Sequence, residues 1–415
     1  MNRTLFLLLF LGLFLLLEWY AFQTVKTLSS SQSEGFQKVL KYVYLALSII
    51  VVLAFVLYNF GNPDGLGKHA RTFLLSFLFI NFLAKFFMSL FLFIDDIQRG
   101  IRWLIAKLSN PESIEAKEGI SRSEFLAKTG IIVAAAPIVS LSWGIISGAH
   151  DYRIRRIPLP IKGLPKKLHG LRMAQLSDIH SGSFWNKTAV KGGVEMLQAE
   201  KVDIAFFTGD LVNNKAEEMS EWVNVFDRVK APLGVYSTLG NHDYGEYVQW
   251  NSAQAKQKNL NDLKSVHELM GWKLLNNEHQ ILEIEGEKLA IIGVENWSAK
   301  GRFPKYGDLK IATQNMEDNA FSVLLSHDPS HWQAEVLSSY PNINLTLSGH
   351  THGMQFGVDI PGIKWSPVQY MYKEWAGLYQ ANSQFLYVNR GFGYIGYPGR
   401  VGILPEITIF ELQTA

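Results

Sequence analysis

Five short polar motifs combine carboxylate, carboxamide and imidazole side chains, and each follows an apolar run of strand length. In chain order they are Ser177–His180 (SDIH), Gly209–Asp210 (GD), Gly240–Asp243 (GNHD), Ser326–His327 (SH) and Gly349–His352 (GHTH). Side chains of these three types bind divalent metal ions through oxygen and nitrogen, and a pair of such ions can hydrolyse phosphate esters. The motifs therefore predict a two-metal site, provided that the fold brings the five segments together.

Asp210 is the natural bridge between two ions, because a carboxylate can span cations that lie about 3.5–4 Å apart. It follows a strand-length run and Gly209. The chain has no cysteine, so nitrogen and oxygen must supply all of the ligands. A mixed N/O set suits Mn²⁺, Fe or Zn²⁺ better than Mg²⁺ or Ca²⁺, which prefer all-oxygen shells.

His242 is the candidate general acid. Two divalent ions would lower the pKa of a shared water and neutralise the phosphoryl oxygens, but the leaving group still needs a proton donor. Asn241 is expected to bind metal, which leaves the neighbouring imidazole of His242 to reach the leaving oxygen. Asp243 is expected to orient His242 or to support the metal site from behind.

Two arginines, Arg390 and Arg400, flank a glycine- and aromatic-rich segment near the C-terminus. Either guanidinium group could clamp a phosphate through two hydrogen bonds, and the alternative is a salt bridge or stacking on an aromatic ring. Several aromatic residues could likewise form an apolar groove or a membrane-facing rim, although core packing is the safer interpretation for most of them: Trp297, Tyr306, Trp365, Tyr370, Tyr372 and Trp375.

Strands and helices must position these groups. Apolar runs predict strands over 171–176, 204–208, 235–239, 323–325 and 345–347, and amphipathic stretches predict helices over 187–200, 216–229, 252–270 and 329–338. This pattern predicts a mixed α/β sandwich. Ligands of open α/β sheets bind beyond the carboxyl ends of strands, and each motif falls at such an end, so we expect one shared site.

The five motifs, in this order, resemble those of the calcineurin-like metallophosphoesterases, from about residue 164 to the C-terminus. LHGL at 168–171 and GILPE at 402–406 further resemble the bacterial membrane-anchored branch, which includes enzymes acting on lipid-linked pyrophosphates such as UDP-diacylglucosamine. The resemblance implies a four-layer α/β/β/α sandwich. It also implies that one metal is held by Asp178, His180, Asp210 and His352, and the other by Asp210, Asn241, His327 and His350. Met354 departs from the branch, which has a second glycine there, so the backbone is expected to be less free to approach a ligand.

The N-terminal part of the chain is predicted to lie in a membrane. Hydrophobic residues make up 48% of the chain, and the excess is concentrated in apolar runs at 4–22, 39–60, 73–94 and 129–149. The first three runs are each long enough to cross a bilayer as a helix, whereas the fourth is shorter in its strictly apolar part and contains Pro137; we expect it to be a span that leads into the soluble portion. The first run could also be a signal peptide, but residues 18–20 are a poor lead-in to a cleavage site. We therefore expect a transmembrane region over 1–150 and a catalytic domain over 157–415, with Glu18 and Lys85 facing protein neighbours.

Lysine and arginine counts favour a cytoplasmic loop between the third and fourth spans, and this orientation places the catalytic domain outside the cytoplasm. The resemblance to the bacterial membrane-anchored branch implies that the spans lie in a bacterial inner membrane. Arg153, Arg155 and Arg156, just after the fourth span, favour the opposite orientation. The net charge of +2 provides no basic field for nucleic acid, and no nucleic-acid partner is expected. The sequence leaves the oligomeric state open.

These observations predict a membrane-anchored, two-metal phosphoesterase acting on phosphodiester or pyrophosphate bonds in lipid-linked substrates. Anchoring would raise the local concentration of such substrates. One alternative is an anchored phosphatase or phosphodiesterase for soluble nucleotides, phosphosugars or phosphoproteins. Another is a membrane receptor or transporter whose C-terminal domain only binds metal.

Overall fold

The computed structural model describes residues 3–61, 63–109, 123–316 and 320–415. The chain forms two compact units, Met1–Trp143 and Gly144–Ala415, which are described separately.

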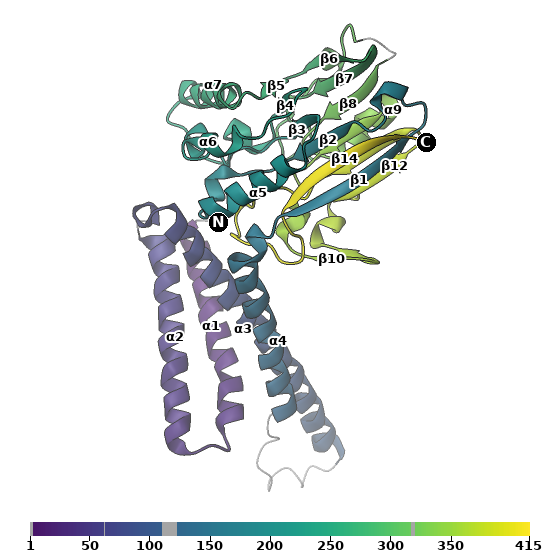
Figure 1. Ribbon diagram of the computed structural model, residues 1–415. Coiled ribbons are helices and arrows are strands. Elements are labelled where there is room, and N and C mark those ends of the chain that lie inside the picture. Colours follow the sequence, from purple (N-terminus) through teal and green to yellow (C-terminus); the bar gives the residue numbers. More distant parts are fainter. Residues whose placement is uncertain (1–2, 62, 110–122, 317–319) are drawn as a thin grey trace. The chain divides into compact units, whose positions relative to one another are not determined.

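The first unit is built from four long helices: α1 (Arg3–Ser29), α2 (Glu34–Phe60), α3 (Lys68–Ser109) and α4 (Glu124–Ile146) (Figure 1). Each contains an apolar stretch that is long enough to cross a membrane, and little of that stretch is buried inside the protein. Large apolar side chains such as Leu9, Leu16 and Leu53 are exposed along these helices. Such surfaces suit lipid rather than water.

A buried ion pair joins three of these helices. The Glu18 carboxylate of α1 contacts the Lys85 ammonium of α3, and Ser48 Oγ of α2 donates a hydrogen bond of 2.5 Å to Glu18 Oε2. The expectation that Glu18 and Lys85 face protein neighbours is thus confirmed. α3 continues far beyond residue 94, and Asp95 accepts a hydrogen bond from the backbone N–H of Ser123 just before α4. Residues 110–122, part of the loop whose lysines and arginines favoured a cytoplasmic location, lie outside the described residues.

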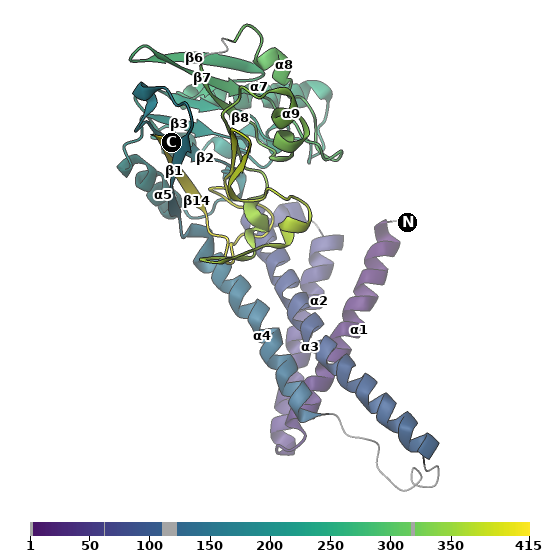
Figure 2. The same ribbon diagram turned by 90° about the vertical axis from the view of Figure 1, so that its right-hand side faces the viewer.

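The second unit contains two six-stranded mixed sheets (Figure 2). The first has the order β1 (Arg153–Ile161), β14 (Glu406–Thr414), β2 (Arg172–Leu176), β3 (Ile204–Phe207), β4 (Val235–Ser237) and β5 (Lys273–Leu274). The second has the order β12 (Gly377–Ala381), β13 (Gln384–Val388), β9 (Leu345–Ser348), β8 (Phe321–Leu325), β7 (Glu287–Gly293) and β6 (Glu278–Ile284). Because β1 pairs with β14 along its whole length, the first sheet begins at Arg153, ahead of residue 157.

Side chains alternate between two cores along each buried strand. In β3, Ile204 and Phe206 point into the core between the two sheets, whereas Ala205 and Phe207 point into a core beneath helices. The helices on that outer face are α5 (Lys187–Ala199), α6 (Val223–Phe226) and α7 (Ala253–Leu269). α8 (Leu309–Ala312), the short π-helix at Trp332–Val336 and α9 (Leu337–Ser339) pack on the second sheet. The predicted four-layer α/β/β/α sandwich is confirmed.

One predicted helix, over 216–229, is shorter than expected. The segment 216–229 forms a 3-10 turn (Ala216–Met219) and then the single turn α6. The Glu218 carboxylate accepts hydrogen bonds from the backbone N–H groups of Asn213, Asn214 and Lys215, which ties this turn to the loop after β3.

A two-stranded ribbon, β10 (Val358–Ile360) and β11 (Ile363–Trp365), stands apart from both sheets.

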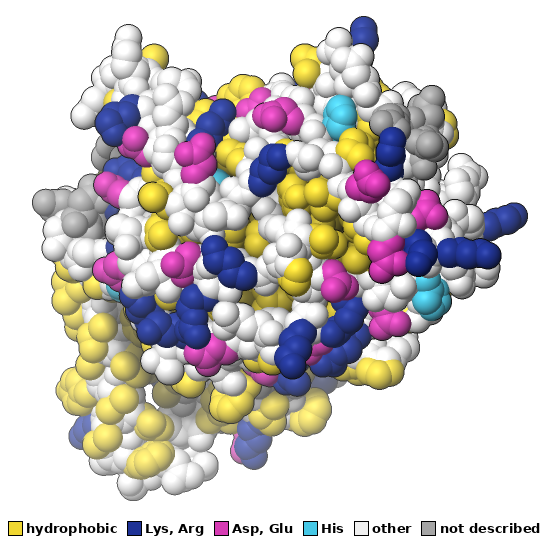
Figure 3. Space-filling view, turned by 45° about the horizontal axis from the view of Figure 1, so that its top comes forward, with side chains coloured by type: hydrophobic (Ala, Val, Ile, Leu, Met, Phe, Trp, Pro, Cys, Tyr) yellow, Lys and Arg dark blue, Asp and Glu magenta, His cyan; other side chains and the backbone are white. Residues whose placement is uncertain are grey.

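The surfaces of the two units differ in kind. In the space-filling view, basic and acidic side chains are interspersed over the visible face of the second unit, whereas the visible helices of the first unit are mostly hydrophobic (Figure 3). Mixed charges are typical of a surface in water.

Candidate metal centre

The five motifs follow strands that lie next to each other. β2, β3 and β4 are parallel neighbours in the first sheet, and β8 and β9 are parallel neighbours in the second. Asp178, Asp210 and Asn241 follow the first three strands, and His327 and His350 follow the other two. The carboxyl ends of all five strands therefore deliver their side chains to one place.

Six of these side chains form two clusters that could each hold a metal ion. One comprises Asp178, His180 and His352, and the other comprises Asp210, His327 and His350. In the first, His352 Nε2 lies 3.0 Å from His180 Nε2 and 3.2 Å from Asp178 Oδ1. Ligand atoms bound about 2.1 Å from a common ion at tetrahedral or octahedral angles lie about 3.0–3.4 Å apart. The spacing and the N/O donor set thus fit a divalent ion.

One oxygen of Asp210 lies between the clusters. Oδ2 is 3.1 Å from His327 Nε2 in the second cluster and 3.5 Å from His180 Nε2 in the first. Asn241 belongs with the second cluster, since its Oδ1 lies 2.8 Å from His350 Nδ1. The carboxylate is therefore placed where a bridge between two ions would have to be.

The backbone at most of the expected ligands adopts a left-handed conformation that residues other than glycine rarely adopt. Five of the seven expected ligands have positive φ: Asp178 (52°), His180 (48°), Asp210 (61°), His350 (70°) and His352 (50°). Each such residue costs about 1–2 kcal/mol, and strain of this kind is concentrated at functional sites. It also separates His350 from His352, which would point the same way in a strand, so that each joins a different cluster.

Protein groups behind the imidazole rings fix which nitrogen faces the site. His327 Nδ1 donates to the carbonyl oxygen of Thr208 at 2.7 Å, so its Nε2 faces Asp210. His350 is turned the other way: its Nε2 lies 3.0 Å from Tyr372 Oη and 3.5 Å from Asp328 Oδ2, so its Nδ1 faces the site. Such partners orient ligands and raise their basicity.

The protein's own charges show how strongly the site favours cations. Burial alone would lower the pKa of His327, but the Asp210 carboxylate beside it raises that pKa to about 10. The same imidazolium outweighs the effect of burial on Asp210 and holds the pKa of that carboxyl well below its usual value.

His242 lies at the mouth of the site. Its Nδ1 is 2.8 Å from the carbonyl oxygen of Asn213, and its backbone N–H donates to Asp210 Oδ1 at 2.9 Å. Its ring stacks at a tilt on Tyr247 and meets His180 edge-on. Since Nδ1 is committed to a carbonyl, Nε2 is the nitrogen left for proton transfer.

Of the two roles expected for Asp243, the structure favours support of the metal site from behind rather than orientation of His242. Asp243 is fully buried, and its carboxylate accepts hydrogen bonds from four backbone N–H groups, those of Asp210, Leu211, Val212 and Gly240. The 3-10 turn His242–Tyr244 directs the two side chains apart. Asp243 therefore holds the Asp210 loop against the Gly240 loop, and Asn213 orients His242 instead.

Arg390 and Arg400 also have partners other than a phosphate. Arg390 is buried in ion pairs with Glu406 (2.6 Å) and Asp359 (3.0 Å). Arg400, only 1% exposed, donates to the carbonyl oxygen of Gly393 and lies 3.1 Å from His352 Nδ1. Both are buried and lie outside the cleft lining formed by described residues, which favours the alternative that they pair inside the protein.

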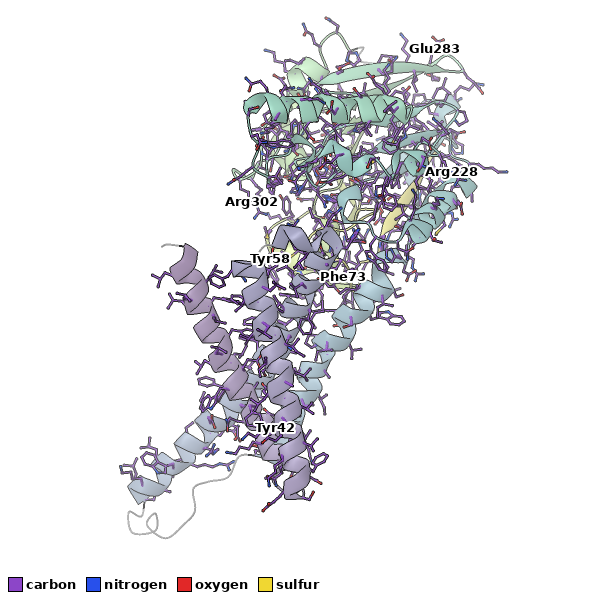
Figure 4. The ribbon with its side chains drawn as sticks, turned by 90° about the vertical axis from the view of Figure 1, so that its left-hand side faces the viewer. Tyr42, Tyr58, Phe73, Arg228, Glu283 and Arg302 are labelled. Atoms are coloured by element: carbon purple, nitrogen blue, oxygen red, sulfur yellow. The ribbon has the colours of Figure 1, made fainter. Side chains whose placement is uncertain are left out.

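A cleft of about 170 Å³ opens over the two clusters. Its lining includes His242 and several residues that the sequence analysis did not single out for this place: Arg302, Phe303, Val368, Met371 and Ile395. Arg302 and Phe303 belong to the loop after β7, which ends at the same edge as the other strands. The apolar run 289–292 would have revealed that strand, and with it this loop. Figure 4 shows Arg302 at the edge of the catalytic unit.

The aromatic residues divide between core and surface. Trp297, Tyr372 and Trp375 are buried, whereas Tyr306, Trp365 and Tyr370 are exposed. Met354, at the position where a glycine was expected, adopts φ 51° despite its side chain, which is half-exposed and lines the cleft.

Comparisons with known proteins agree with this geometry. Residues 171–354 match the family model "Calcineurin-like phosphoesterase", and residues 2–149 match "Probable Calcineurin-like phosphoesterase, transmembrane domain". A "Transmembrane protein with metallophosphoesterase domain" from Danio rerio is 28% identical over 73% of this chain and 66% of its own length. An "Uncharacterized metallophosphoesterase" from Bacillus subtilis is 29% identical over 71% of this chain and 98% of its own. A "UDP-2,3-diacylglucosamine pyrophosphatase" from Chlamydia trachomatis is 27% identical over 63% of this chain and 89% of its own.

Proposed function

Since the chain is a membrane protein that belongs to the calcineurin-like metallophosphoesterases, we propose that it hydrolyses phosphodiester or pyrophosphate bonds with two divalent metal ions. The observation that carries this proposal is the place of Asp210 Oδ2 between two ligand clusters, with His242 at the mouth of the same cleft. Mixed nitrogen and oxygen ligands favour Mn²⁺, Fe or Zn²⁺.

The residues that would hold the ions follow from the two clusters. Asp178, His180, Asp210 and His352 would hold one, and Asp210, Asn241, His327 and His350 would hold the other. When bound, the ions supply an activated water and neutralise the phosphoryl charge. His242, as the imidazolium, would donate its Nε2 proton to the leaving oxygen, while its Nδ1–H stays hydrogen-bonded to the Asn213 carbonyl.

Arg302 would bind a phosphate oxygen of the substrate. It contributes the guanidinium group to the described cleft lining and lies over the ring of Phe303. Because Arg302 is exposed, we expect Arg302→Ala to raise KM by only about tenfold. Arg228 is another exposed arginine of the catalytic unit (Figure 4), and Arg228→Ala is the control. An unchanged KM would remove Arg302 from the site.

The decisive test of the proposal is metal-dependent hydrolysis by the full chain in detergent. We expect hydrolysis of a chromogenic phosphodiester to disappear with a chelator and to return with added Mn²⁺ or Zn²⁺. Asp210→Asn should lose most of the bound metal and the activity. Undiminished hydrolysis by that variant would refute the bridging role, and no metal-dependent hydrolysis of any phosphoester would favour the receptor or transporter alternative.

The proposed substrates are lipid-linked, and the site would face outward from a bacterial inner membrane. Two observations support a lipid-linked class: the four-helix membrane region and the apolar wall of the cleft formed by Val368, Met371 and Ile395. The relative from Chlamydia trachomatis bears the name of an enzyme for a diacylated sugar nucleotide. Comparing a diacyl pyrophosphate substrate with its deacylated analogue tests this class, since equal rates would favour the soluble-substrate alternative.

A further inference from the structure

The ribbon β10–β11 exposes its apolar face, while the charged groups of Asp359 and Lys364 on the other face contact the rest of the catalytic unit. Pairing places Val358 opposite Trp365 and Ile360 opposite Ile363, so these four side chains share one face of the ribbon. Ile360 and Ile363 are 55% and 56% exposed. A ribbon of a soluble protein has the opposite arrangement, with apolar side chains inward.

The charged face is tied firmly to the catalytic unit. Asp359 lies between Arg390 and Arg155, and its side chain is only 12% exposed. On the paired strand, the Lys364 ammonium donates to the carbonyl oxygen of Ala376. These contacts fix which face of the ribbon points outward, because a slip of one residue would bury the isoleucines and expose the ion pairs.

The exposed apolar surface extends from the ribbon to the cleft. Phe356 and Tyr370, close to the two ends of the ribbon in sequence, are also exposed, as are Met354 and Met371, which line the cleft. Most of the exposed large hydrophobic side chains that the structure describes in the second unit fall between residues 354 and 378. Such a concentration marks an interaction surface.

The same segment is attached to the end of a membrane-spanning helix. The last residues of α4, 144–146, belong to the second unit, and the carbonyl oxygen of Gly144 accepts a hydrogen bond of 3.1 Å from the N–H of Arg400. The next residue, Val401, bridges to Phe356, and its carbonyl oxygen accepts a hydrogen bond from Gly357, directly before β10. Backbone hydrogen bonds of Arg400 and Val401 thus connect the end of the apolar helix to the segment at which the exposed face begins.

We propose that the apolar face of β10–β11, with Phe356 and Tyr370, inserts into the interfacial zone of a phospholipid bilayer and holds the cleft mouth at the membrane surface. Trp365 and Tyr370 are the amphipathic rings that this zone favours. The occupant is the bilayer, because Gly144, the apolar residue at which the second unit begins, is hydrogen-bonded to Arg400 next to the segment that leads into the ribbon.

The absence of cysteine makes the test direct, since a single introduced cysteine gives one labelling position. We would attach an environment-sensitive fluorophore at Ile363→Cys in the full chain reconstituted in phosphatidylcholine–phosphatidylglycerol vesicles. Glu283→Cys is the control, because β6 and β10 lie at opposite ends of the catalytic unit (Figure 1). Quenching would be measured with aqueous iodide and with spin-labelled lipids.

We expect iodide to quench the label at residue 363 roughly threefold or more weakly than at residue 283, and spin-labelled lipid to quench only residue 363. Adding Ile360→Ser should weaken lipid quenching at residue 363, with unchanged circular dichroism showing that the fold is kept. Equal iodide quenching at both positions would overturn the proposal. Protection from iodide without lipid quenching would also overturn it, since it would mean that a second copy of the chain covers the ribbon.

Discussion

At the scale of single residues, His242 is positioned so that only one ring nitrogen faces the cleft. Nδ1 is hydrogen-bonded to the Asn213 carbonyl oxygen. The backbone N–H of His242 donates to Asp210, whose carboxylate lies between the two metal clusters. The proton donor and the bridge are thereby fixed relative to each other. The rate increase that a general acid provides is larger for a poorer leaving group, because such a group needs the proton more.

We predict that His242→Gln slows hydrolysis of esters with alkoxide leaving groups by about 10²–10⁴-fold, and slows p-nitrophenyl esters far less. The reason is that nitrophenolate leaves without protonation. Steady-state kinetics with a matched series of phosphodiesters measures this difference, and metal analysis should show unchanged metal content. An equal loss for every leaving group would contradict a role as acid and point to binding instead.

The sequence predicted the set of polar residues better than their individual roles. Motif order and strand ends were enough to bring Asp178, Asp210 and His350 to one place, because parallel strands present their carboxyl ends at one edge. The role of Asp243 depends on the direction of a 3-10 turn, which spacing alone does not give. Arg390 and Arg400 looked available in a glycine-rich segment, but burial, which comes from distant strands, commits them to Asp359, Glu406 and Gly393.

At the scale of elements, the loops after the strands must approach each other closely. A Cβ atom on Gly349, after β9, would lie 2.1 Å from Asp178 Oδ2, after β2. That distance is far below van der Waals contact, so only glycine lets the loops from the two sheets meet. The two-sheet arrangement and the metal site therefore depend on the same contact.

We predict that Gly349→Ala lowers the free energy of unfolding by about 1–3 kcal/mol and displaces Asp178, so that metal content falls. Gly192→Ala in α5 is the matched control, because a Cβ there meets nothing within 4 Å. It should raise stability by about 0.5–1 kcal/mol. Thermal unfolding and metal analysis of both variants check this, and full metal content in Gly349→Ala would show that the loop can move aside.

Element lengths were predicted less well than element positions. The apolar run at 73–94 predicted only part of α3, which spans Lys68–Ser109, because the continuation to Ser109 is amphipathic rather than apolar. The amphipathic pattern at 216–229 suggested one helix, yet Glu218 binds the backbone of the metal-site loop and limits the helix to single turns. In the segment 216–229, contacts from elsewhere override the local periodicity.

The buried pair of Glu18 and Lys85 in the helical unit gives a prediction that is independent of catalysis. We expect Glu18→Leu or Lys85→Leu alone to destabilise the unit by about 3–5 kcal/mol, since each leaves one uncompensated charge among apolar helices. The double variant should recover most of that loss. Unfolding of the reconstituted chain by denaturing detergent measures all three, and additive losses in the double variant would mean that the two side chains act independently.

At the scale of the whole molecule, one chain combines a membrane-embedded unit with a catalytic unit whose cleft continues into an exposed apolar surface. Either feature alone would be compatible with soluble substrates. Together they favour substrates that share the enzyme's own bilayer, because a tethered cleft meets such molecules at a high effective concentration.

We therefore predict that the full chain in lipid nanodiscs hydrolyses a diacyl pyrophosphate substrate about 10²-fold faster when the substrate is in the same disc than in separate discs. A soluble chromogenic diester should be hydrolysed at one rate in both arrangements, since its concentration at the cleft does not depend on the disc. Product release measured at equal total substrate distinguishes the two. If the substrate in separate discs is hydrolysed as fast as that in the same disc, the tether serves only to localise the enzyme, and the natural substrate is then to be sought among soluble phosphoesters.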